Sequence, residues 1–382
     1  MTHFISAVRF IAVSSIMLGV LLAGNPIAAV EAGGGDSVTF TIVVKVSPEA
    51  SHATSESVTR KDWERSWKEA KFEEPATPSF PYTDVYMEIA EGGGKRMFAI
   101  KEDGVLVEAG TNLTVAMPAK IRHQWLEYAD LLRDKHYGDM LEWGQAKSRV
   151  PLKGKLTVFD LETGLSFQAQ RRAGSHHADV QPLTRADTAV MKQIYGGKWS
   201  WKRRAILVLS DDRPIAASMH GMPHGGDGIP DNGFSGHFCI HFLGSSTHRS
   251  GQVDLAHQLM VHKAAGKLPE LLGQASPERM AESLFEALHQ QDGALLRAAL
   301  HGASAETQEK FEKLLRTVDD VRVAPFKQSP DRSESVEAEI PVKVTIQGRG
   351  GGLREETFRL QFVRETIQSP WILTDADSGK GR

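Results

Sequence analysis

The sequence predicts an α+β protein of several domains, with a β-rich central domain between a small α/β module and a C-terminal α+β module. Its 382 residues exceed what one ordinary hydrophobic core accommodates. Short runs in which apolar and polar residues alternate, a pattern typical of strands, recur through residues 139–267. In residues 276–375, runs of helical periodicity come first and strand-like runs follow.

Residues 1–32 are typical of a signal peptide. Arg9 precedes an apolar run, Phe10–Leu22, and Val30-Glu31-Ala32 offers the small-x-small spacing at which signal peptidases cleave. The run is shorter than the roughly 20 apolar residues that span a membrane. We therefore expect export to the periplasm or cell envelope, with no other membrane contact. The alternative is an uncleaved N-terminal anchor.

Residues 37–138 form the predicted α/β module. Trp63 and Trp67, four residues apart after Thr59, indicate a short helix, and Pro118 begins a second helix that reaches about Lys135. The strand-like runs of this module are Val38–Val46, Asp84–Ala90, Lys95–Ile100 and Val105–Ala109.

Residues 139–267 form the predicted β-rich domain. Glu162-Thr163-Gly164 is a plausible tight turn between two strands. The expected strands are Lys155–Asp160, Leu165–Arg171, Arg204–Leu209 and Pro214–Ser218, and the expected helices are Thr184–Ile194 and Asp254–Ala265.

Residues 276–375 form the predicted C-terminal module. Ser276-Pro277-Glu278 is a typical helix start, and Met280, Leu284 and Leu288 form one apolar stripe. Further helices are expected at Asp292–Leu300 and Ala305–Thr317, and strands at Val336–Gln347, Glu355–Arg364 and Trp371–Thr374. This order resembles the cone of nuclear transport factor-like domains. We expect the tail from Ser378 to be disordered.

Charge and cysteine content narrow the possible partners and chemistry. The 45 basic and 48 acidic residues nearly cancel, which gives no reason to expect a nucleic acid partner. The only cysteine, Cys239, cannot form an internal disulfide. In an exported protein such a thiol is buried and inert, a metal ligand, or a nucleophile.

The residues around Cys239 favour a reactive or metal-binding thiol over an inert one. In an extended chain, side chains two apart share a face, so His237, Cys239 and His241 point one way while the alternate residues Phe238, Ile240 and Phe242 point into a core. Upstream, the glycine-rich run from His220 to Gly226 includes His224 and predicts a shaped loop. An adjacent imidazole activates a thiol, and His220 and His237 are the expected partners.

This pattern resembles the signature of the YkuD-type L,D-transpeptidases. His220-Gly221 is followed by 14 residues and then by Gly236-His237-Phe238-Cys239-Ile240-His241. Gly236, Phe238 and His241 stand where that family has Ser or Thr, Gly, and Arg. The resemblance implies a nucleophilic Cys239, catalytic His220 and His237, and a site that binds peptidoglycan stem peptides without a cofactor. His241, His224, Gly221 and Gly236 would then contact the substrate.

Two alternatives remain open. Cys239 and the nearby histidines, with His177-Ala178-Asp179 on a neighbouring strand, offer the ligand types that zinc prefers. We expect no metal, because His237, Cys239 and His241 follow one strand and would not surround a common centre. The domain could also be a catalytically inactive binding module of the cell envelope.

Overall fold

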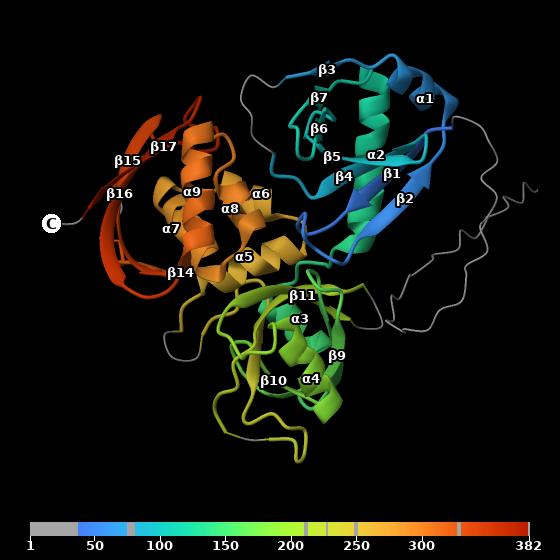
Figure 1. Cartoon of the computed structure of the whole chain (residues 1–382). Coiled ribbons are helices and arrows are strands. Elements are labelled where there is room, and N and C mark those ends of the chain that lie inside the picture. Colours follow the sequence, from blue (N-terminus) through green and yellow to red (C-terminus); the bar gives the residue numbers. More distant parts are fainter. Residues whose placement is uncertain are drawn as a thin grey trace, which may run out of the picture. The chain divides into compact units, whose positions relative to one another are not determined.

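The computed structural model describes residues 37–74, 81–209, 213–226, 228–247, 251–326 and 330–380. The expected signal peptide therefore lies outside the described residues, as does His248. Residues from Ser37 onward form one compact unit. The described residues fold into helices, two open sheets and a closed barrel, which confirms the α+β class (Figure 1). None of the helices in these residues is both long and apolar enough to cross a membrane.

The first sheet has seven strands, in the order β2-β1-β4-β5-β6-β7-β3, and every pairing is antiparallel. Helix α1 (Lys61–Lys68) buries Trp63 and Trp67 against Phe40 of this sheet, and helix α2 (Ala119–His136) packs on β1 and β2. The strands are β1 (Thr39–Val44), β2 (Thr54–Val58), β3 (Phe72–Glu73), β4 (Val85–Glu91), β5 (Gly94–Ile100), β6 (Leu106–Glu108) and β7 (Thr114–Val115).

The central strands close into an antiparallel barrel in the order β10-β13-β12-β11-β8-β9. They are β8 (Lys155–Asp160), β9 (Ser166–Ala173), β10 (Ala178–Pro182), β11 (Arg203–Leu209), β12 (Ile215–His220) and β13 (Phe238–His241). Helices α3 (Trp143–Arg149) and α4 (Arg185–Ile194) belong to this part, and α5 (Leu255–Ala264) packs against β11 and β12. The apolar interior is built around fully buried side chains such as Val158, Val180, Ile206 and Phe238.

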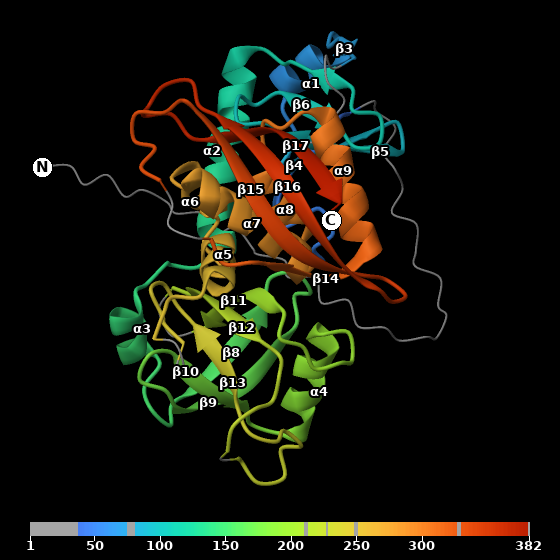
Figure 2. The ribbon, with the colours of Figure 1, turned by 90° about the vertical axis from the view of Figure 1, so that its left-hand side faces the viewer.

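The C-terminal part consists of helices followed by a curved antiparallel sheet, β14-β15-β16-β17, with α7 and α9 on one face (Figures 1 and 2). Its elements are α6 (Leu268–Gly273), α7 (Pro277–Gln290), α8 (Gly293–Ala299), α9 (Ala305–Thr317), β14 (Val318–Val323), β15 (Glu337–Gly348), β16 (Leu353–Val363) and β17 (Ile372–Lys380). The expected disorder from Ser378 is wrong up to Lys380, which pairs with Glu356 of β16.

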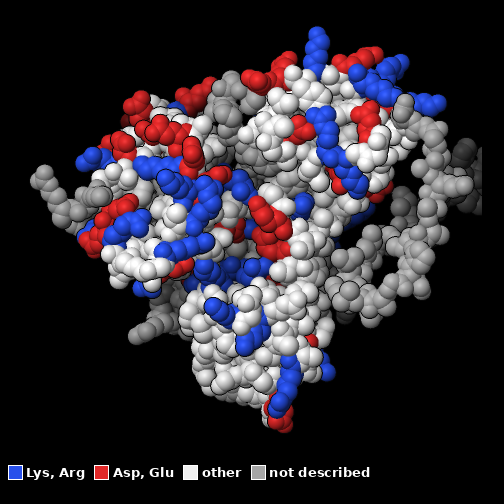
Figure 3. All heavy atoms as spheres, viewed as in Figure 1, with Lys and Arg blue, Asp and Glu red and all other residues white. Residues whose placement is uncertain are grey.

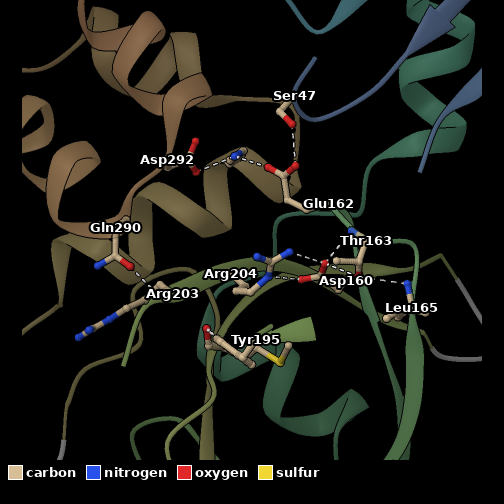
Figure 4. A network of polar contacts seen from close by, with 12 residues as sticks. Ser47, Asp160, Glu162, Thr163, Leu165, Tyr195, Arg203, Arg204, Gln290 and Asp292 are labelled. Carbon is tan, nitrogen blue, oxygen red and sulfur yellow. Dashed lines mark hydrogen bonds and ion pairs between the residues drawn. The ribbon is translucent and has the colours of Figure 1, made fainter. Parts of the chain in front are cut away.

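A buried polar network joins the barrel to its neighbours (Figure 4). The ammonium group of Lys263 on α5 lies 2.8 Å from Glu162 Oε1 and 2.6 Å from Asp292 Oδ2. Ser47, which follows β1, donates a hydrogen bond of 2.6 Å to Glu162 Oε2. Glu162 belongs to the predicted β8–β9 turn, so this turn contacts both the N-terminal sheet and the C-terminal helices, and α5 is fixed against the barrel.

Charged side chains are mixed on the face of the molecule seen in Figure 3, where Lys and Arg lie among Asp and Glu. The distribution on this face agrees with the formal net charge of −3.

Candidate functional site

Strand β13 places Cys239 on the outer face of the barrel. Phe238 and Ile240 are fully buried in the barrel interior, so Cys239 and His241 point to the opposite side, as the alternation predicted. Other elements cover this side, because Cys239 is only 5% exposed and His241 only 2%. The candidate site is therefore an enclosed cluster between the barrel wall, helix α5 and the loop after β12.

The loop after β12 folds back onto the residues that precede β13. His224 and His237 exchange two backbone hydrogen bonds, of 3.0 and 2.8 Å. A Cβ atom on Gly236, at φ +91°, would lie 2.2 Å from the carbonyl oxygen of His224, and one on Gly225, at φ +70°, would lie 2.4 Å from the His237 ring. Both positions therefore require glycine for the loop to reach the cysteine.

The sulfur of Cys239 lies among histidines. Its closest imidazole contact is with His224 Nε2, at 3.5 Å. A potential ligand atom lies within 4.8 Å of the sulfur on each of six side chains: His177, Asp179, His220, His224, His237 and His241. Among the described residues, the hydrogen bonds of the sulfur involve His224 and Asp179, whereas His220 Nδ1 accepts the backbone N–H of Met222 (3.3 Å). A role for His220 or His237 beside the thiol stays a prediction.

Asp179 is the carboxylate of the site. It lies directly opposite Cys239 in the pairing of β10 with β13. One oxygen, Oδ1, is 3.8 Å from the sulfur, 3.2 Å from His177 Nε2 and 3.8 Å from His237 Nε2. The sequence pointed to Asp179 only as a metal-ligand alternative, through its i,i+2 spacing from His177.

Three histidine rings stack beside the sulfur. The His241 ring lies between those of His177 and His257, with centroid distances of 4.3 and 3.7 Å. His241 Nδ1 is buried and has no hydrogen-bond partner among the described residues. The expected contact between His241 and substrate stays a prediction. His257 of α5 is 2% exposed and contacts Ser218 Oγ through Nδ1 at 2.9 Å.

Burial determines the charge of the resting site. It raises the pKa of the Cys239 thiol, and the negative charge of Asp179 raises it further. Burial also lowers the pKa of His220, His241 and His257 well below the usual value, and the neighbouring imidazoles add to this effect for each of them. At neutral pH the thiol of Cys239 is therefore protonated, and the imidazoles of His220, His241 and His257 are neutral.

A groove of about 650 Å³ approaches the cluster from the side of Asp179. It is lined by Lys147, Leu152, Arg171, Arg172, Ala173, Gly174, Ser175 and Asp179. On the other side, the ring of Trp201 covers those of His220 and His224, at centroid distances of 4.7 and 5.2 Å. Gly221 donates its backbone N–H to Ser200 at 2.8 Å and so fixes the start of the loop.

Donor atoms from other segments gather around the sulfur of Cys239. Three groups have ligand atoms within 4.8 Å of one another: His177–Cys239–His241, His220–His224–Cys239 and Asp179–His237–Cys239. Strand β10 and the folded loop supply the donors that β13 lacks.

Comparison of the chain with models of protein families, with curated proteins and with solved structures finds no match. The resemblance to L,D-transpeptidases therefore rests on the motif around Cys239.

Proposed function

We propose that this protein is an exported cysteine-dependent acyl transferase or amidase that acts on peptidoglycan-type peptides at the cell envelope. One observation carries the proposal: His224 Nε2 lies 3.5 Å from Cys239 Sγ in the tautomer that can accept the thiol proton. His224 Nδ1 lies 3.0 Å from the carbonyl oxygen of Met222, which can only accept, so Nδ1 must carry the hydrogen. Nε2 of the neutral ring is then a base.

The reaction begins from the neutral pair. Cys239 Sγ attacks the carbonyl carbon of an amide while His224 Nε2 takes the thiol proton. The C–N bond breaks, the leaving amine takes the proton from His224, and the acyl group remains on sulfur as a thioester. An acceptor amine or water then attacks the thioester, and the thiol is restored. Because proton transfer accompanies attack, a raised resting pKa of the thiol is compatible with this route.

His237 positions His224 beside the sulfur. His237 holds the backbone of His224 through the two hydrogen bonds between them. Its ring nitrogen Nε2 lies 3.8 Å from Asp179 Oδ1. We assign His224 the base role that the motif gave to His220 or His237.

The substrate class rests on the motif and on the groove. The His-Gly and Gly-His-x-Cys spacing resembles that of enzymes that cross-link stem peptides. Lys147 and Arg172 lie along the groove next to Asp179. Their cationic groups suit the free carboxylates that such peptides carry.

The test is a single-turnover assay with intact-protein mass spectrometry. The wild-type chain and a stem tetrapeptide should give an acyl adduct, and Cys239→Ala should give none. His224→Ala should slow adduct formation by roughly 10²–10⁴-fold, the usual contribution of a general base. His123→Ala, on the exposed face of α2, is the matched control and should leave the rate unchanged. No adduct with wild type, or a rate unaffected by His224→Ala, would exclude this mechanism.

A further inference from the structure

The donor atoms around Cys239 differ from those of a simple thiol–imidazole pair. An acyl-transfer site requires one sulfur and one base, whereas the described residues place a carboxylate and several further imidazoles against the same sulfur. From this geometry we infer that the cluster binds one transition-metal ion of the zinc class through Cys239, His224, His237 and Asp179. The ion would occupy the sulfur and the His224 nitrogen that the proposed acyl transfer uses, so metal binding and acyl transfer belong to different states of the protein.

The separations between donor atoms fit one metal centre. Metal–ligand bonds of about 2.0–2.3 Å at tetrahedral angles place neighbouring ligand atoms about 3.5 Å apart. The sulfur lies 3.5 Å from His224 Nε2 and 3.8 Å from Asp179 Oδ1. Asp179 Oδ1 is in turn 3.8 Å from His237 Nε2. Binding of one ion would bring together the donors of two groups that share this sulfur, His220–His224–Cys239 and Asp179–His237–Cys239.

The ligands also have the outer contacts that metal ligands require. His224 donates its Nδ1–H to the carbonyl of Met222, which leaves Nε2 with a lone pair directed toward the sulfur. His177 Nε2 lies 3.2 Å from Asp179 Oδ1, and its Nδ1 donates to the carbonyl oxygen of Ser246 at 2.8 Å. Partners of this kind fix ring orientation and carboxylate position before a metal arrives.

The donor set selects the kind of metal. One thiolate and two imidazoles favour zinc and neighbouring transition metals, whereas magnesium and calcium require oxygen ligands. The groove that reaches Asp179 provides a path for the ion, and 17% of the His237 side chain is exposed.

A further group of donor atoms, on His177, His241 and Cys239, could bind the ion instead. We place the ion on the opposite side because the rings of His177 and His241 are stacked on each other and on His257. Turning either ring toward the ion would disrupt this packing. A variant at His241 therefore separates the two arrangements.

The experiment is a zinc titration of the full chain after dialysis against a chelator, with a chromophoric zinc indicator as competitor. We expect one Zn²⁺ per chain. Cys239→Ser, His224→Ala, His237→Ala and Asp179→Asn should each weaken binding at least 100-fold. His241→Phe, which keeps a stacking ring, and the distant His123→Ala should change the affinity less than threefold. Circular dichroism of each variant identifies any loss of fold.

A second measurement needs no variant. Addition of Co²⁺ to the wild-type protein should produce a thiolate-to-cobalt charge-transfer band, which requires coordination by Cys239. The inference is overturned if zinc binds no more tightly than to Cys239→Ser, if the cobalt band is absent, or if His241→Phe abolishes binding. Because no peptide is present, these results do not depend on whether acyl transfer occurs. A protein that forms the acyl adduct but binds no zinc would retain only the proposed function.

Discussion

Replacement of Lys263 by methionine should destabilise the fold by about 3 kcal/mol. Lys263 is 3% exposed, and its ammonium group lies within 2.8 Å of one carboxylate and 2.6 Å of another. Removing one partner of a buried ion pair costs about 3–5 kcal/mol, because the remaining charge stays desolvated. We expect the lower end of this range, because the side chains of Glu162 and Asp292 are 24% and 14% exposed and water can partly solvate their charges.

Urea unfolding monitored by tryptophan fluorescence at pH 7 measures this loss. Lys267→Met is the matched control, because that side chain is 47% exposed and its contact with Glu270 spans 3.7 Å. It should change the free energy of unfolding by less than about 0.5 kcal/mol. A loss below about 1 kcal/mol for Lys263→Met would refute the argument, because it would mean that the two carboxylates need no buried cation.

The pH dependence of the same variant gives a second readout. Burial opposes ionisation of Asp292, but the charge of Lys263 outweighs it and lowers the pKa of that carboxyl below 3.8. In the wild type, Asp292 therefore contributes stability above about pH 4 that is lost as pH falls through its folded pKa. Without Lys263, burial still opposes ionisation of Asp292, and only the Leu295 N–H and the charge of Arg204 favour it. The stability difference between the two proteins should thus shrink below about pH 4.

Three further outcomes are expected. Gly236→Ala should lower the free energy of unfolding in urea by roughly 1–3 kcal/mol, because the added Cβ would lie 2.2 Å from the His224 carbonyl oxygen. Gly226→Ala, which has open space around it, should leave the free energy nearly unchanged. Equal effects of the two variants would contradict the close approach at Gly236. Iodoacetamide should modify Cys239 of chelator-treated native protein at least tenfold more slowly than free cysteine at pH 7.5, and unfolding in urea should abolish the difference, since burial raises the thiol pKa. Burial lowers the pKa of His136 to about 3, so below pH 6.5 the unfolded chain protonates this imidazole while the folded protein keeps it neutral. The free energy of unfolding therefore falls by about 1.4 kcal/mol per pH unit below pH 6.5. His136→Leu should reduce the acid slope of unfolding free energy by that amount, while His123→Leu on the same helix should not; parallel slopes would argue against a neutral, buried His136.

Sequence periodicity predicted most elements because their apolar faces are regular. The alternation around Cys239 placed Phe238 and Ile240 in the barrel interior, as observed. Strand β2 was missed because Thr54–Val58 has no buried residue and only one strongly apolar side chain. Strand β14 was missed for a similar reason, since Val318–Val323 contains two aspartates and an arginine.

The site itself was only partly predictable. The sequence identified Cys239 and the histidines near it, but contacts between distant segments decide which imidazole reaches the sulfur. His224 reaches it through the turn that Gly225 and Gly236 allow. The burial of His257 was not predicted, because this residue lies outside the motif around Cys239. The helix around it, Leu255–Ala264, is buried on nearly every side, and its apolar composition around the whole circumference could have indicated this.

The pairing of β13 with its neighbours couples the site to the folding of the barrel. Asp179 faces Cys239 across β10, and Ser218 faces His241 across β12. A slip of β13 by one residue would turn the thiol and both imidazoles into the barrel interior and expose Phe238 and Ile240 to the outer face. The large cost of that exchange means that a chain with a folded barrel has also assembled its cysteine cluster. Loss of the cluster by misregistration would therefore be observed as failure to fold, not as a folded protein with a disordered site.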